Sequence, residues 1–130
     1  MKTKTVWKKN HQFTSHQDHN VIQLDGSRQH GSSPKSLLLS GLAGCSGIDV
    51  VDILTKMRVD FSAFEIEAET TQTEENPKVF KDIHLVYKIK TAGKNEEKVR
   101  KAIDLSLEKY CGVSAMLSKN SDIHYTIQLL

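Results

Sequence analysis

Residues 33–54 read SPKSLLLSGLAGCSGIDVVDIL, and this stretch decides the fold. Ser33 followed by Pro34 is typical of a helix start, because serine caps a first turn and proline fits its first position. The apolar residues that follow are Leu37, Leu38, Leu42, Cys45, Ile48, Val51, Ile53 and Leu54. They cover most of a helix circumference rather than one stripe, as in a helix at the centre of a fold or at a subunit interface. We therefore predict a central helix from Pro34 to about Met57.

Small residues surround Cys45 in this helix. Gly41, Gly44 and Gly47 recur at three-residue spacing, although each glycine costs up to about 1 kcal/mol relative to alanine in a helix interior. Their spacing indicates that another element packs closely against that face. Cys45 lies among them, where a close partner can reach its sulfur.

Alternating sequences on either side of a turn predict a strand pair. Residues 64–69 (FEIEAE) and 83–90 (IHLVYKIK) alternate apolar with charged or polar side chains, as half-buried strands do. The turn falls at residues 74–77, and an antiparallel pair would place acidic residues opposite basic ones. Weaker strand character is found at residues 3–8 and 20–25, with a His- and Gln-rich connection between them.

The last third of the chain predicts two helices and a strand. Asn95, followed by two glutamates, opens a helix whose apolar residues recur through to Tyr110. Cys111 then stands just before a short helix that begins at Val113, where backbone N–H groups and the helix dipole lower a thiol pKa. Residues 123–129 alternate as a closing strand. The order of these elements predicts an α+β fold.

The composition is that of an ordinary soluble domain, with 38% hydrophobic and 26% charged residues among 130. We expect one domain over residues 1–130, with N-terminal strands in 1–30 and a core in 31–130. The net charge of +2 is spread along the chain, so we expect neither nucleic acid nor a membrane as partner. No apolar run follows the basic start, and residues 37–51 are interrupted and too short to span a bilayer. These features predict a cytoplasmic protein.

The chain has two cysteines, Cys45 and Cys111, which lie 66 positions apart and form no CxxC or zinc spacing. Two such cysteines in a reducing compartment are most often inert core residues. The sequence surroundings of each are nevertheless also compatible with a redox-active pair. The histidines also lack metal-ligand spacing; they are His11, His16, His19, His30, His84 and His124. We expect no metal and no other cofactor.

Both cysteine segments resemble those of a known family. LLLSGLAGCSGIDVVDIL (residues 37–54) resembles the motif around the first cysteine of the OsmC/Ohr superfamily, which contains osmotically inducible protein C and organic hydroperoxide resistance proteins. AIDLSLEKYCGVSAML (residues 102–117) resembles the segment around the second cysteine. The likeness covers residues 20–130, and the form of both motifs is most similar to an OsmC-like branch of that superfamily.

The resemblance implies both a fold and an activity. The fold would be OsmC-like, with antiparallel sheets around long central helices in an intertwined homodimer. The activity would be reduction of organic hydroperoxides by cysteine, without metal or haem. In that reaction Cys45 would be the peroxidatic cysteine and Cys111 the resolving one, and an external dithiol would reduce their disulfide.

The chain departs from the family at the residues that support the first cysteine. The family places a glutamate just after the proline of the first motif and pairs it with an N-terminal arginine, whereas Lys35 and Ser36 stand here. Arg28 is the only arginine before the motif and is the candidate cation that activates Cys45, although Arg28 is equally well interpreted as a solvated loop residue. Lys35 is the alternative candidate for that cation. The missing acid leaves an alternative open, a non-catalytic OsmC-like binding or carrier protein for a small electrophile or thiol ligand.

Overall fold

The computed structural model describes residues 1–130 and divides them into two compact units, Met1–Leu39 and Ser40–Leu130. The sequence placed the end of the N-terminal strands at residue 30. The third strand ends at Asp25, and the first unit continues into the helix α1 (Pro34–Lys56).

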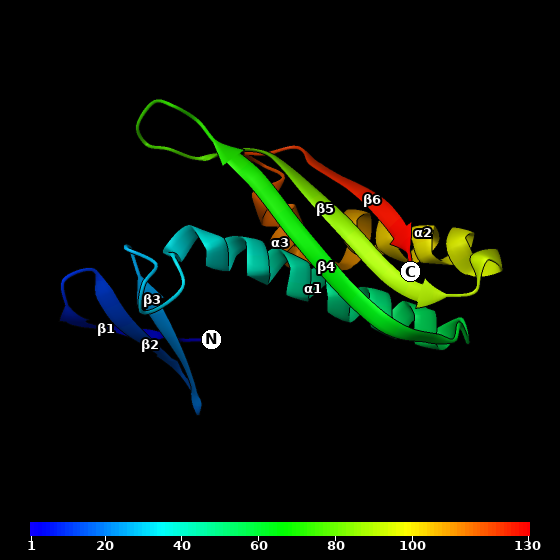
Figure 1. The fold of residues 1–130 in the computed structure, drawn as a ribbon, viewed down its shortest axis with the longest axis horizontal. Helices are drawn as coiled ribbons and strands as arrows, with labels where there is room; N and C mark the ends of the chain where they lie inside the picture. The colour runs from blue at the N-terminus through cyan, green and yellow to red at the C-terminus, as the bar shows by residue number, and fades with distance from the viewer. The chain divides into compact units, whose positions relative to one another are not determined.

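The first unit contains a three-stranded antiparallel sheet in the order β1 (Lys4–Lys9), β2 (Gln12–Gln17) and β3 (Asn20–Asp25) (Figure 1). The two outer strands confirm the weak strand character seen in the sequence. The central strand β2 was interpreted as a connection, which is wrong. Its residues are mostly polar and give no alternating signal, but both neighbouring strands supply backbone hydrogen-bond partners to it.

Helix α1 confirms the predicted central helix and begins as the sequence indicated. The Ser33 hydroxyl accepts a hydrogen bond from the Ser36 N–H at 3.3 Å, which caps the first turn. Just beyond the last turn, Arg58 adopts a left-handed conformation with φ of 57°. The N–H of Val59 then donates to the Leu54 carbonyl at 3.0 Å.

The length of α1 corrects one expectation. The helix has 23 residues. Its most apolar 18-residue stretch has a mean hydropathy of 1.7, and 22% of that stretch is buried. It is therefore long and apolar enough to cross a membrane, whereas the stretch considered in the sequence was judged too short. Core helices of soluble proteins meet the same criterion, so this property alone does not assign a membrane span.

The second unit contains a sheet in the order β4 (Phe61–Gln72), β5 (Phe80–Thr91) and β6 (Ile123–Leu129). The predicted β4–β5 hairpin is confirmed, with Glu65 directly opposite Lys88. Lys88 forms ion pairs with both Glu65 and Glu67 on the outer face. These pairs are solvent-exposed, so they favour this register only modestly.

Strand β6 pairs with β5 in parallel, so the sheet is mixed rather than wholly antiparallel as expected. The reason is the connection, which is a crossover through helices rather than a hairpin. It comprises the 3₁₀ turn η1 (Gly93–Asn95), α2 (Glu96–Leu105), the π-helical turn η2 (Ser106–Tyr110) and α3 (Gly112–Leu117). The α+β fold class itself is confirmed.

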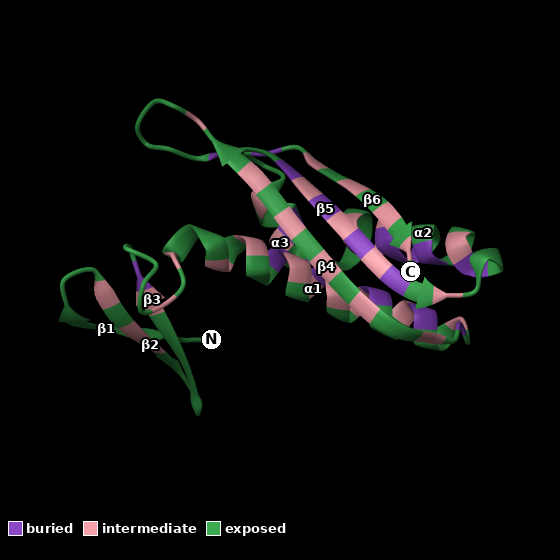
Figure 2. Ribbon diagram, viewed as in Figure 1, coloured by how far each residue is buried: buried purple, intermediate pink, exposed green.

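The core of the second unit lies between the sheet and the helices. Figure 2 shows buried residues alternating along β5, and these are Ile83, Leu85, Tyr87 and Ile89. The helices contribute the buried residues Leu42, Ser46, Val50 and Leu54 from α1 and Val99, Ala102 and Ile103 from α2. The core therefore places β5 next to the helix that carries Cys45.

Candidate redox site

Cys45 and Cys111 both belong to the second unit, and the fold brings them together. Cys45 is half-buried on α1, and Cys111 is buried immediately before α3, with both present as free thiols. The side chains of Cys45 and Cys111 interact, and this interaction raises the pKa of Cys111. Two residues far apart in sequence are thus neighbours in space, as the redox interpretation requires.

Local hydrogen bonds hold Cys111 in place. Its N–H donates to the Ser106 carbonyl at 2.7 Å, which closes the π-helical turn η2. Its sulfur accepts a hydrogen bond from the Ser114 N–H at 3.3 Å, so Cys111 caps α3 with its side chain. The Ser114 hydroxyl in turn donates to the Cys111 carbonyl at 2.9 Å. The backbone of Cys111 is therefore fixed on both sides.

The net electrostatic effect on Cys111 is opposite to that expected from the sequence. Burial raises the pKa of the Cys111 thiol, the hydrogen bond from the Ser114 N–H lowers it, and the Cys45 thiol raises it again. The result is a pKa above the ordinary value of 9.0. The helix start acts as predicted, but only 3% of Cys111 is exposed and its desolvation outweighs that contribution.

The glycines near Cys45 lie in two different surroundings. A side chain at Gly47 would approach the Ile66 Cδ1 to 3.1 Å, which confirms close packing at that position. Gly41 and Gly44 have open space beside them instead. An open groove of about 540 Å³ runs between α1 and β4, and its lining includes Gly44, Gly47, Ile48, Val51, Phe64 and Ile66. The groove is mostly apolar and has the size of a small-molecule site.

Arg28, the candidate activating cation, belongs to the first unit. It has a left-handed backbone with φ of 63°, and its N–H donates to the Asp25 carbonyl at 3.0 Å. Burial raises the pKa of Asp25, but hydrogen bonds from Ser27 and His30 bring it below 3.8. A buried carboxylate thus organises the loop that carries Arg28. Lys35 lies in the first turn of α1.

A buried hydroxyl network beside the cysteines was missed by the sequence analysis. It joins Tyr87, Ser46 and Ser106 to the carboxylate of Asp49. A signal was available, because Ser46 falls in the buried i, i+4 series of α1. A polar residue at a core position needs a hydrogen-bond partner, and its presence there predicts one.

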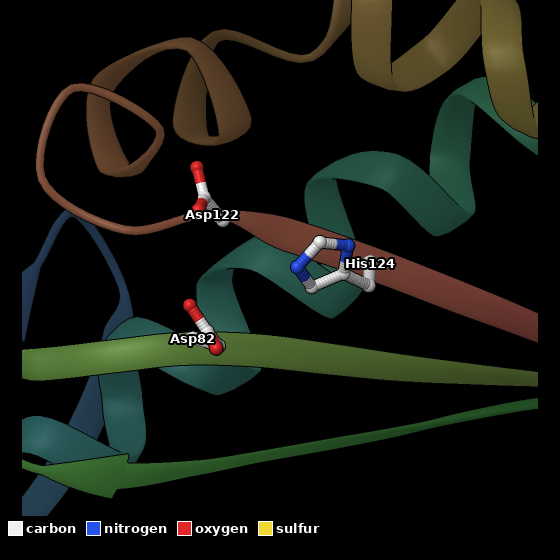
Figure 3. Close-up of side chains that lie close together, drawn as sticks. All are labelled: Asp82, Asp122 and His124. Carbon is white, nitrogen blue, oxygen red and sulfur yellow. The ribbon is translucent and has the colours of Figure 1, made fainter.

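Figure 3 shows a second cluster at the start of β5 and β6, formed by Asp82, Asp122 and His124. One potential metal-ligand atom from each side chain lies within 4.8 Å of the others. Sequence spacing could not indicate this group, because the parallel pairing of the two strands brings it together. All three side chains are exposed, and exposed acidic groups of this kind are common without a metal. We assign no metal site to them.

The chain matches a family model and a curated relative over most of its length. The family model described as "OsmC-like protein" matches residues 25–126. Protein YhfA of Escherichia coli strain K12 is 34% identical over 112 residues, which cover 86% of this chain and 84% of YhfA.

Solved structures share the fold along nearly the whole chain. An OsmC-like protein from Mycoplasma pneumoniae has a TM-score of 0.87 at 18% identity, with 99% of this chain and 96% of that chain covered. The organic hydroperoxide resistance protein OhrB of Bacillus subtilis has a TM-score of 0.73 at 18% identity, with 98% of each chain covered.

The raised pKa of Cys111 predicts a difference in alkylation between the two thiols. In the reduced protein at pH 7, iodoacetamide should modify half-buried Cys45 faster than buried Cys111. The rate at Cys111 should rise about tenfold per pH unit and continue to rise above pH 9, because the thiolate is the nucleophile. Peptide mass spectrometry after timed quenching measures both rates. A Cys111 rate that levels off below pH 8 would contradict this account.

Proposed function

The chain belongs to the OsmC-like protein family, and on that premise we propose that it reduces organic hydroperoxides with Cys45 and Cys111. The observation that carries the proposal is the pairing of two free thiols in one compact unit, one half-exposed and the other buried. A half-exposed thiol is open to a small substrate. A buried thiol beside it is protected from the oxidant and is ready to resolve the product.

The proposed reaction has two steps on the protein. The Cys45 thiolate attacks the distal oxygen of ROOH, the O–O bond breaks, and the alkoxide leaves as ROH after taking a proton. Cys45 is left as a sulfenic acid. The Cys111 sulfur then attacks the Cys45 sulfur, so that the S–S bond forms, the S–O bond breaks and water leaves. An external dithiol returns the disulfide to two thiols.

A cation near Cys45 would favour its thiolate. The family pattern gives this role to an arginine, and Arg28 is the candidate here. Hydrogen bonds to Asp25 hold the loop that carries Arg28. Lys35 is the alternative, although its ammonium lacks the planar fork of a guanidinium.

We also propose that the protein acts as an intertwined homodimer in the cytoplasm. The exposed apolar residues of α1 support a dimer, since 66% of Ile48 and 37% of Val51 are accessible in the single chain. Both residues line the groove along β4. A second copy that covers this surface would remove a large apolar area from water.

One observation favours a second candidate function. The family glutamate is absent, because Lys35 and Ser36 stand at its position. The apolar groove between α1 and β4 is large enough to hold a small molecule. A non-catalytic protein that binds a small electrophile or thiol ligand there would keep both cysteines as free thiols after exposure to a hydroperoxide.

Peroxide consumption separates the two functions. One equivalent of cumene hydroperoxide should convert the wild-type protein to a Cys45–Cys111 disulfide within one chain. Cys111→Ser should instead accumulate sulfenic acid on Cys45, with sulfinic acid forming when oxidant is in excess. Intact-mass and peptide mass spectrometry identify each species, and Cys45→Ser is the control that should not react. Two unmodified thiols in the treated wild type would favour the binding protein.

The activating cation is tested by paired substitutions. Arg28→Ala should slow oxidation of Cys45 at pH 7 by at least about tenfold, which corresponds to about 1.4 kcal/mol. The deficit should shrink at higher pH, where the thiol ionises without help. Lys35→Ala is the matched control and should cost less. A slow Lys35→Ala beside an unchanged Arg28→Ala would transfer the role to the lysine.

The oligomeric state is tested at the exposed face of α1. Wild-type protein should be a dimer at micromolar concentration by light scattering, and Ile48→Glu should weaken that dimer by placing a charge in an apolar interface. Lys101→Glu, on the exposed face of α2, is the control and should leave the dimer intact. A well-folded wild-type monomer would contradict the proposal.

A further inference from the structure

The buried hydroxyl network next to the thiols is continuous. Ser46 and Tyr87 oxygens lie 2.6 Å apart, and the Ser106 hydroxyl is 3.0 Å from that of Ser46. The Ser106 hydroxyl is also 2.9 Å from the Asp49 Oδ2. Tyr87, Ser46 and Ser106 are fully buried, whereas Asp49 is half-buried. The network therefore runs from the interior of the unit to a carboxylate near its surface.

Ser106 is the shared donor of the network. A carboxylate oxygen only accepts, so Ser106 is the donor toward Asp49. The Ser106 hydroxyl is also placed to donate to the Ser46 hydroxyl, so Asp49 and Ser46 share it as a donor. Ser46 and Tyr87 share the last hydrogen bond, in which either oxygen can donate. No buried side-chain nitrogen or oxygen in the structure lacks a partner, which agrees with a complete network.

The same network reaches the backbone of both cysteines. Ser46 directly follows Cys45 on α1. Ser106 begins the π-helical turn, and its carbonyl accepts the N–H of Cys111 at 2.7 Å. The side chain of Ser106 therefore bonds the helix of one cysteine while its backbone bonds the other cysteine. π-Helical turns are rare and often occur at functional sites.

We propose that Tyr87, Ser46, Ser106 and Asp49 are positioning residues that keep the Cys45 and Cys111 sulfurs adjacent and thereby favour formation of their disulfide. This inference deepens the proposed function and rests on the redox pair that it assigns. None of the four residues takes part in bond changes. Their effect is on proximity, since a fixed geometry raises the effective concentration of one thiol at the other.

The proposal differs from a merely structural role in what it predicts for the disulfide. A substitution that weakens the dithiol and disulfide forms equally lowers stability but leaves their equilibrium unchanged. Loss of positioning changes the equilibrium itself, because it makes the disulfide easier to reduce. The equilibrium with dithiothreitol is therefore the decisive readout, and it does not depend on peroxidase activity.

The experiment equilibrates the full-length protein with mixtures of reduced and oxidised dithiothreitol and quantifies free thiols by alkylation and mass spectrometry. Ser106→Ala should shift the equilibrium at least tenfold toward the dithiol form. Asp49→Ala should shift it at least fivefold, whereas Asp49→Asn, which keeps an acceptor oxygen, should stay within threefold of wild type. Ser118→Ala is the control: this exposed serine at the C-terminal end of α3 bonds the Ala115 carbonyl and no residue of the network, so the equilibrium should stay unchanged.

The outcomes are distinct. If Ser106→Ala does not fold, the Asp49 pair carries the test, because that residue is half-exposed and tolerates substitution better. An equilibrium within twofold of wild type in Asp49→Ala, and in Ser106→Ala where that variant folds, would overturn the positioning role. A wild type that forms no disulfide in oxidised dithiothreitol or with diamide would overturn the redox pair as well. A normal disulfide equilibrium without hydroperoxide reduction would reject the proposed function and keep the positioning role.

Discussion

Helix α1 packs against the sheet through residues four apart, Leu42, Ser46, Val50 and Leu54, and the rest of the second unit depends on this contact. Three of these residues are aliphatic and supply apolar burial. The fourth, Ser46, is polar and bonds Tyr87 on β5. A polar group in such a position makes the packing specific, because a shift of the helix would leave a buried hydroxyl without a partner.

The two thiols also lie in different surroundings. Cys45 is next to Ser46 on α1 but lies outside the fully buried i, i+4 series, and it remains half-exposed. Cys111 lies within the crossover between β5 and β6, just before α3, where burial raises its pKa. A thiol with a raised pKa is mostly protonated at neutral pH and resists oxidation by free peroxide. In the proposed reaction it reacts instead with the sulfenic acid held beside it on Cys45.

Much of this arrangement follows from sequence periodicity. The all-round apolar pattern of residues 37–54 predicted α1, and strict alternation predicted the β4–β5 hairpin and β6. Periodicity has no direction, however, so it could not show that β6 runs parallel to β5. It also missed β2, whose polar residues form a strand only because two neighbours pair with it. The sequence placed Cys111 just before a short helix, but whether its pKa is raised or lowered depends on tertiary burial. The hydroxyl network joins residues 41 and 60 positions apart and is visible only in three dimensions.

The central claim is that peroxide oxidises Cys45 first and that Cys111 then resolves it. Quenched-flow mixing with one equivalent of cumene hydroperoxide, with dimedone trapping and mass spectrometry at each time point, follows both species in the same sample. The account predicts that sulfenic acid on Cys45 appears before the disulfide and decays with the rate constant at which the disulfide forms. Sulfenic acid that forms first on Cys111, or thiols that persist while the peroxide remains unconsumed, would contradict it.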